Sequence, residues 1–295
     1  MIKILNQRWS RYYLFVLIVI ILGVFLCFFL LTKQSLWYDE GLTLSLTDAS
    51  TLQETIEKVR TVKNSDRFQP LYFIVLFLWR QMFGESEFAL RSLSALLGIG
   101  SIIAVFFTAL RIYGKKHALW SLVIITFSSF CVYYSQEARI YALAIFICSL
   151  QLYFFSAVLV KNEDNQGISI WLFSILTGIG VFSNINFCFS TIALCLSHIP
   201  IYKNLRQWLQ WWLPAAFLSL PPVLYYLTLP GATDPESITV SRLGFPIIQN
   251  IIFVLYGILV GTTMGLQRSN CMAMIKYRLC LVTCLTYFYW LLSVL

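Results

Sequence analysis

Charged residues are scarce in this sequence, and that scarcity excludes an ordinary soluble domain. Only 12% of its 295 residues are charged, whereas about 25% is usual for soluble proteins. Hydrophobic residues make up 59%, in runs long enough to cross a hydrocarbon core of about 30 Å. A soluble protein cannot bury so much apolar surface, so the sequence predicts an integral membrane protein.

Paired cysteines are also lacking. The eight cysteines are scattered, most of them inside apolar runs, and no two form a C-x-x-C pair. This pattern predicts small packing residues and argues against a disulfide framework or a thiolate metal site.

The formal net charge of +8 raises the question of nucleic-acid binding. The basic residues, however, stand in short segments between apolar runs. Such a distribution orients a protein in a membrane and makes no continuous basic surface. We therefore expect no nucleic-acid partner.

The apolar runs predict an all-α fold, a polytopic transmembrane helical bundle with about nine spans. The first run, Tyr12 to Thr32, is longer than a signal-peptide core of about 7–15 residues and lacks a small-x-small cleavage site. We interpret it as a retained helix. The other predicted spans are residues 89–112, 118–135, 140–160, 168–184, 185–201, 208–228, 246–266 and 279–295.

Orientation depends on the short apolar stretch from Leu71 to Phe83, which would reach only about 20 Å as a helix. If it does not span and the N-terminus is cytoplasmic, the basic clusters near residues 3–11, 111–116, 203–206 and 268–278 all lie in the cytoplasm. This arrangement satisfies the positive-inside tendency. Residues 33–88 then form a large first extracytoplasmic loop.

Two interfacial helices are predicted within that loop. Ser50-x-x-Gln53 and Thr51-x-x-Glu54 are capping-box patterns, and they precede an amphipathic stretch near residues 51–63. Pro70 suits the first turn of a second helix near residues 70–83.

Acidic residues number only 13, and nearly half of them fall between positions 39 and 66. The most notable are Asp39 and Glu40, which follow Trp37-Tyr38 just after the first span. Neighbouring carboxylates at a membrane exit are costly unless paired or functional, and one of them can serve as a general base. The alternative is the polar end of a span with aromatic anchors.

A second polar site is Glu137-Ala138-Arg139, at the predicted outer junction of two spans. Its guanidinium can neutralise a phosphate, or the two charges can form a local ion pair that stabilises a turn. Both polar sites are predicted at one membrane surface. Their convergence would suit a substrate with a lipid tail and a phosphate head.

The order of these motifs resembles a known superfamily. Trp37-Tyr38-Asp39-Glu40 is followed by Gln69-Pro70-Leu71-Tyr72-Phe73, then by Phe83-Gly84-x-x-Glu87-Phe88-Ala-Leu-Arg91-x-x-Ser94 and Tyr134-Ser-Gln-Glu137-Ala-Arg139-Ile-Tyr141. Over residues ~10–200 the chain resembles the GT-C membrane glycosyltransferases. It is most similar to the branch of protein O-mannosyltransferases and aminoarabinose transferase-like enzymes.

This resemblance implies an inverting glycosyltransferase of the cell envelope that uses a polyprenyl-phosphate-linked sugar on the extracytoplasmic face. The acceptor would be a hydroxyl of a lipid, glycan or protein. By the same resemblance, Asp39 is the general base and Arg139 neutralises the leaving phosphate. Glu40 and Glu137 complete the catalytic set by orienting the acceptor or holding a divalent cation. The other substrate-binding residues implied are Gln69, Tyr72, Arg91 and Tyr141.

The chain departs from the family at two places. Relatives often carry His-Pro-Pro-Leu where this chain has Phe68-Gln69-Pro70-Leu71, so we assign no metal ligand and no certain cofactor. Residues 1–266 are interpreted as the catalytic module and residues 267–295 as an atypical, possibly truncated tail with the last helix. The alternatives are a truncated inactive family member and a lipid-sugar flippase.

Overall fold

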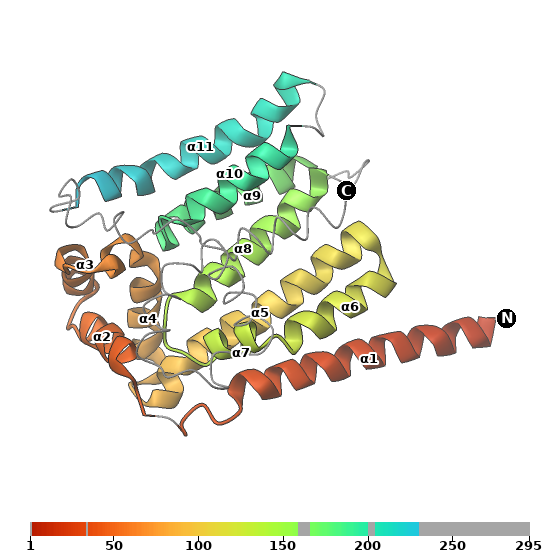
Figure 1. The fold of residues 1–295 in the computed structure, drawn as a ribbon, viewed down its shortest axis with the longest axis horizontal. Helices are drawn as coiled ribbons and strands as arrows, with labels where there is room; N and C mark the ends of the chain where they lie inside the picture. The colour runs from red at the N-terminus through yellow and green to blue at the C-terminus, as the bar shows by residue number, and fades with distance from the viewer. Residues whose placement is uncertain (1, 34, 159–165, 200–203, 230–295) are drawn as a thin grey trace, which may run out of the picture. The chain divides into compact units, whose positions relative to one another are not determined.

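The computed structural model describes residues 2–33, 35–158, 166–199 and 204–229, and every regular element among them is a helix (Figure 1). The chain divides into two compact units. Unit 1 comprises Met1–Ser45 and Leu76–Ser169, and unit 2 comprises Leu46–Val75 and Ile170–Leu295. Helices α2 (Tyr38–Thr47) and α4 (Pro70–Phe83) each contribute residues to both units.

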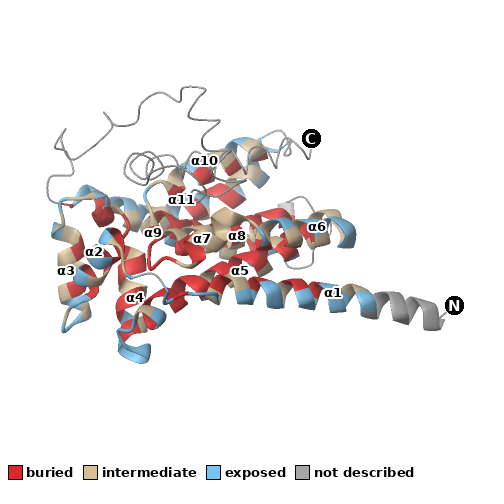
Figure 2. Ribbon diagram, turned by 60° about the horizontal axis from the view of Figure 1, so that its bottom comes forward, coloured by how far each residue is buried: buried red, intermediate tan, exposed pale blue. Residues whose placement is uncertain are grey.

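Helix α5 (Glu87–Tyr113) is the centre of unit 1. It packs against α1 (Ile2–Phe28), α6 (Lys115–Thr126), α7 (Ser129–Ser135) and α8 (Tyr141–Phe155). A buried apolar core of α1, α5 and α6 residues includes Val19, Ile102 and Leu122. Figure 2 shows buried residues along α5, whereas one side of α1 is exposed. Because the exposed α1 residues include Leu14, Ile18 and Phe25, that side suits contact with lipid.

Helices α6 and α7 form a bent pair with an angle of 56° between them. Phe127 and Ser128 lie at the break, and the Ser128 hydroxyl accepts from the Cys131 amide to begin α7. The bend brings α7 against α5 at Gly98. A Cβ atom at Gly98 would lie 2.0 Å from Ser135 Oγ, so only glycine permits this approach.

Unit 2 contains α3 (Leu52–Thr61), the 3-10 helix η1 (Ser65–Phe68), α10 (Phe187–His198), α11 (Leu205–Leu227) and most of α9 (Gln166–Ser183). An aromatic cluster joins the last three helices. The Phe173 ring lies 5.6 Å from Trp211 and 5.3 Å from Trp212. Trp212 Nε1 donates to Nδ1 of the fully buried His198 at 2.9 Å.

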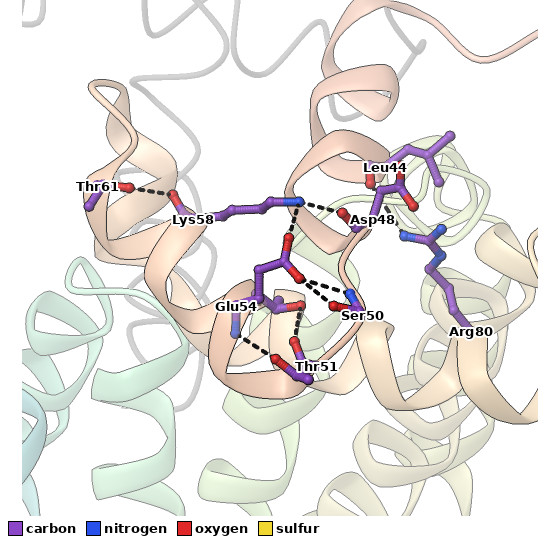
Figure 3. A network of polar contacts seen from close by, with 9 residues as sticks. Leu44, Asp48, Ser50, Thr51, Glu54, Lys58, Thr61 and Arg80 are labelled. Atoms are coloured by element: carbon purple, nitrogen blue, oxygen red, sulfur yellow. Dashed lines mark hydrogen bonds and ion pairs between the residues drawn. The ribbon is translucent and has the colours of Figure 1, made fainter.

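The two predicted helices of the first loop are present as α3 and α4, and Pro70 begins α4 as expected. Thr51 Oγ1 accepts from the Glu54 amide at 3.2 Å (Figure 3). The Glu54 carboxylate accepts from the Ser50 amide, one residue earlier than a regular capping box places it. Lys58 bonds both Glu54 and the Asp48 carbonyl. Helix α2 was not predicted.

Three described helices are long and apolar enough to cross a membrane: α1 over Arg11–Phe28, α5 and α9. The described residues contain a fourth candidate span if the bent α6–α7 pair is counted as one. The predicted spans 140–160 and 185–201 correspond to the shorter apolar helices α8 and α10. The predicted spans 246–266 and 279–295, and the tail 267–295, lie outside the described residues. The number of about nine spans and the membrane location of residues 33–88 therefore stay predictions.

Candidate active site

Asp39 and Glu40 lie in the first turn of α2, where the helix dipole favours negative charge. Glu40 Oε2 accepts from the backbone amide of Trp37 at 3.4 Å, which is half of a capping box. Both acids are buried, with 4% of Asp39 and 1% of Glu40 exposed. Carboxylates this deeply buried need hydrogen-bond or ion-pair partners.

Glu40 forms a bidentate ion pair with Arg91 of α5. Arg91 Nε donates to Oε1 at 2.9 Å, and Arg91 Nη2 donates to Oε2 at 2.7 Å. Arg91 also donates to the carbonyls of Leu31 and Ser35, in the segment that follows α1. Arg91 therefore connects α5 to both the start of α2 and the segment between α1 and α2.

The Glu137–Arg139 turn is bound to the first part of α2 by three hydrogen bonds. The Ala138 amide donates to Glu40 Oε1 at 2.8 Å. Arg139 Nη1 donates to the Asp39 carbonyl at 3.2 Å and to Thr43 Oγ1 at 2.8 Å. The convergence expected for the two polar sites is thus present within unit 1.

The same turn is also held by α1. Gln136 Nε2 donates to the carbonyls of Leu26 and Phe29, at 2.7 Å and 3.1 Å. Leu26 is in the last turn of α1 and Phe29 directly follows it, where a helix leaves carbonyl acceptors without intrahelical donors. The end of α1 and the first part of α2 therefore both hold the turn in position.

Glu137 differs from Glu40 in the partners around it. Its carboxyl group is hydrogen-bonded to Tyr133 and lies in the field of Glu40, Arg139 and Asp39. Burial raises the pKa of Glu137 from 4.5 to about 7, and the negative charge of Glu40 adds to the rise, against the lowering effect of the Tyr133 hydrogen bond. This turn therefore holds a carboxyl group that titrates near neutral pH.

Arg80 holds the other end of α2. Its Nη1 atom donates to the Leu44 carbonyl at 3.3 Å (Figure 3), and its Nη2 atom pairs with Glu85 at 2.6 Å. The Arg80 side chain is buried although the sequence placed it at a polar helix end. With α2 held at both ends, the backbone that carries Asp39 is fixed.

Six of the predicted site residues lie in unit 1: Asp39, Glu40, Arg91, Glu137, Arg139 and Tyr141. Tyr141 begins α8, and its ring lies 4.7 Å from that of Tyr134. Gln69 and Tyr72 belong to unit 2. Gln69 Oε1 is buried with no hydrogen-bond partner among the described residues, and Tyr72 is fully buried beside Phe73.

Among the described residues, no group of three or more His, Cys, Asp or Glu side chains is arranged to hold a metal ion. The two oxygens of Glu40 are already directed at Arg91 and the Ala138 amide. This geometry does not fit a divalent cation held by Glu40. We derive no chemical step through a metal.

Sequence reasoning missed two features of the site. Thr43, the partner of Arg139, was not singled out because a threonine in an apolar stretch has no distinctive pattern. The pairing of Arg91 with Glu40 joins residues 51 positions apart in sequence, a separation that no local spacing rule reaches. The clue for Arg91 was its place inside an apolar run, where an arginine needs a buried partner.

Comparison with known proteins identifies the family. The model of the dolichyl-phosphate-mannose-protein mannosyltransferase family matches residues 69–229, which is more than half of the chain. No curated protein and no solved structure matches. The matched region includes Arg91, the Glu137–Arg139 turn and Tyr141, whereas Asp39 and Glu40 precede it. The chain therefore belongs to the dolichyl-phosphate-mannose-protein mannosyltransferase family, a family of GT-C membrane glycosyltransferases.

Proposed function

We propose that this protein transfers a sugar from a polyprenyl-phosphate donor to an acceptor hydroxyl on the extracytoplasmic face of the membrane, with inversion at the anomeric carbon. The family match supports membrane glycosyltransferase activity. The observation that carries the proposal is the buried network that joins the Asp39 backbone to Arg139. It places an acid and a guanidinium in one structural unit, at the end of apolar helices.

In the proposed reaction, Asp39 acts as the general base. It takes the proton from the acceptor hydroxyl while that oxygen bonds to the anomeric carbon. The bond from the anomeric carbon to the phosphate oxygen breaks, and its electron pair leaves with the lipid phosphate. A phosphate needs neutralisation of charge more than protonation, and Arg139 supplies the positive charge.

The remaining residues position these two groups. Glu40 and Arg91 hold the backbone of α2 and of the Glu137–Arg139 turn. In the proposal Tyr141 is a further substrate-binding residue of unit 1. The acceptor class, whether lipid, glycan or protein, is left to experiment.

The test of function is sugar transfer in proteoliposomes. The donors are radiolabelled polyprenyl-phosphate hexoses, the acceptors are crude membranes, and Asp39→Asn is the control. Transfer by the wild type that falls about 10²–10⁴-fold in Asp39→Asn is expected for loss of a general base. Equal activity in both would remove Asp39 from this role, and folded protein inactive with every donor would favour a non-catalytic member.

The proposed orientation has a separate test by cysteine labelling in intact cells, with the wild type as the background. Met82 is 74% exposed, so Met82→Cys is more suitable than the buried Arg80. We expect Met82→Cys to react with an impermeant maleimide from outside. Lys116→Cys, at an exposed position on the predicted cytoplasmic side, should react only after permeabilisation. The reverse pattern would overturn the topology.

A further inference from the structure

The ionisable groups of the unit 1 network differ in whether their hydrogen-bond partners are charged or neutral. The guanidinium of Arg91 is directed at both oxygens of Glu40. Arg139 Nη1 is directed at the Asp39 carbonyl and the Thr43 hydroxyl. The hydrogen-bond partner identified for the Glu137 carboxyl is the phenol of Tyr133. Glu137 therefore differs from Glu40, which is paired with Arg91, in having a neutral side chain as its hydrogen-bond partner.

Several charged and titratable groups face Glu137 from the elements packed around it. They are Asp39 and Glu40 of α2, Arg91 of α5, Tyr133 and Tyr134 of α7, and Arg139 of the same turn. Two of these neighbours are acids whose charges oppose its ionisation. Because 8% of Glu137 is exposed, water screens little of that repulsion. Burial, together with these neighbouring acids, raises the pKa of Glu137 to about 7.

The charge balance of the cluster depends on this one proton. With Asp39, Glu40 and Glu137 all ionised, the acids outnumber the two arginines, Arg91 and Arg139, and the buried cluster is negative. With a proton on Glu137 the cluster is neutral. An incoming phosphate diester adds one negative charge, so its binding is favoured by the protonated form.

We propose that an anionic lipid phosphodiester binds to this site together with a proton on Glu137, so that donor affinity decreases as Glu137 ionises. The inference rests on the proposed function and adds a proton linkage to donor binding. In the balanced step, ionised protein, donor monoanion and one solvent proton give the protonated protein with the donor bound. No bond to the sugar changes in this step.

The experiment measures binding of a polyprenyl phosphohexose to the full-length protein in nanodiscs between pH 6 and pH 9. This probe is a phosphodiester, so its own charge stays constant over the range. For a single linked proton with a pKa near 7, the wild-type Kd should rise by about tenfold for each pH unit above it, and about 100-fold by pH 9. Glu137→Gln carries no titrating proton, so its Kd should stay constant.

Two further variants control the result. Glu57→Gln removes one acid from an exposed position of α3 and should keep the wild-type pH dependence. Tyr133→Phe removes a hydrogen bond that favours the ionised form of Glu137. It should therefore move the break in the pH profile to higher pH, and it tests the linkage even if Glu137→Gln does not fold.

The outcomes separate this inference from the proposed function. A wild-type Kd that is constant with pH, or the same pH dependence in Glu137→Gln, overturns the proton linkage while donor binding stands. An unchanged profile in Tyr133→Phe also counts against it. Folded wild-type protein that binds no polyprenyl phosphohexose at any pH would contradict the proposed function itself.

Discussion

The charged network of unit 1 and the aromatic cluster of unit 2 bury polar groups in different ways. In the network, Glu40 and Arg91 keep full charges inside the protein, with side chains 1% and 5% exposed. In the aromatic cluster, the fully buried His198 accepts a hydrogen bond from Trp212 at Nδ1, and its other described contacts include the rings of Trp211 and Trp212. Both groups are buried, yet only the first carries formal charge.

The two regions differ in the energetic cost of burying their polar groups. Burying an ion pair costs desolvation energy, and the Coulomb attraction between the two charges often does no more than offset that cost. Apolar residues of equal volume therefore commonly stabilise a fold as well or better. A neutral ring cluster has no such cost. The phosphate and proton chemistry proposed above would explain why the network keeps these charges, whereas stability alone does not require them.

The largest expected effect comes from breaking the ion pair. Glu40→Ala leaves the Arg91 guanidinium buried without its carboxylate, which typically costs about 3–5 kcal/mol. The double variant Glu40→Leu/Arg91→Met should recover much of that loss but not the transfer activity. Thermal unfolding in detergent and transfer assays measure the two effects. Recovery of both stability and activity would show that the charges serve stability alone.

A smaller effect is expected in the aromatic cluster. Trp212→Phe removes the indole donor to His198 and should lower the free energy of unfolding by about 1–3 kcal/mol. Trp208→Phe is a matched control, because Trp208 Nε1 is buried with no hydrogen-bond partner among the described residues. Transfer per folded molecule should be unchanged in both variants. A large loss of transfer in Trp212→Phe alone would mean that this cluster also has a functional role.

A third prediction tests whether the close contact between α5 and α7 at Gly98 positions the Glu137–Arg139 turn of the charged network. In Gly98→Ala the new Cβ would meet the Ser135 side chain, so α7 must shift, at a cost of about 1–3 kcal/mol. Gly98→Ala/Ser135→Gly should restore both stability and activity. Gly41→Ala is the control, since a Cβ at Gly41 would have no neighbour within 4 Å. A tolerated Gly98→Ala without the second change would show that this contact does not position the turn.

The smallest effect is expected at Glu54 on α3. Hydrogen bonds from the Ser50 amide and then Lys58 lower the pKa of Glu54 from 4.5 to about 2. Because the folded pKa is the lower one, Glu54 adds stability above pH 4.5 and loses it as the pH falls toward 2. Wild type should melt slightly above Glu54→Gln at pH 7, and the two melting temperatures should converge near pH 2. A constant difference across this range would exclude the ionised carboxylate as its source.

The sequence predicted most helices because apolar length and capping are local signals. Pro70 and the Thr51–Glu54 pair marked the starts of α4 and α3. Helix α2 was missed because its N-cap is Trp37, which lacks the oxygen of a regular capping residue. The bend at Phe127 was missed because residues 118–135 read as one continuous apolar run.

The site residues were predicted by type and order, but their partners were not. The sequence predicted that Asp39, Glu40, Glu137 and Arg139 lie at one membrane surface. In the structure, hydrogen bonds connect the two segments that carry them within unit 1. Which carboxylate Arg91 would pair with depends on the packing of α5 against the α1–α2 connection. Long-range contacts of this kind leave no periodic trace in a single sequence.

The most direct test of a functional charged network is to measure sugar transfer and thermal stability together for Asp39→Asn. Asparagine keeps the size of the side chain and removes the carboxyl group that would accept the proton. We predict that transfer falls at least about 100-fold, while the melting temperature stays the same or rises. Transfer that falls only in proportion to the loss of folded protein would contradict the account, because the network would then serve structure and not chemistry.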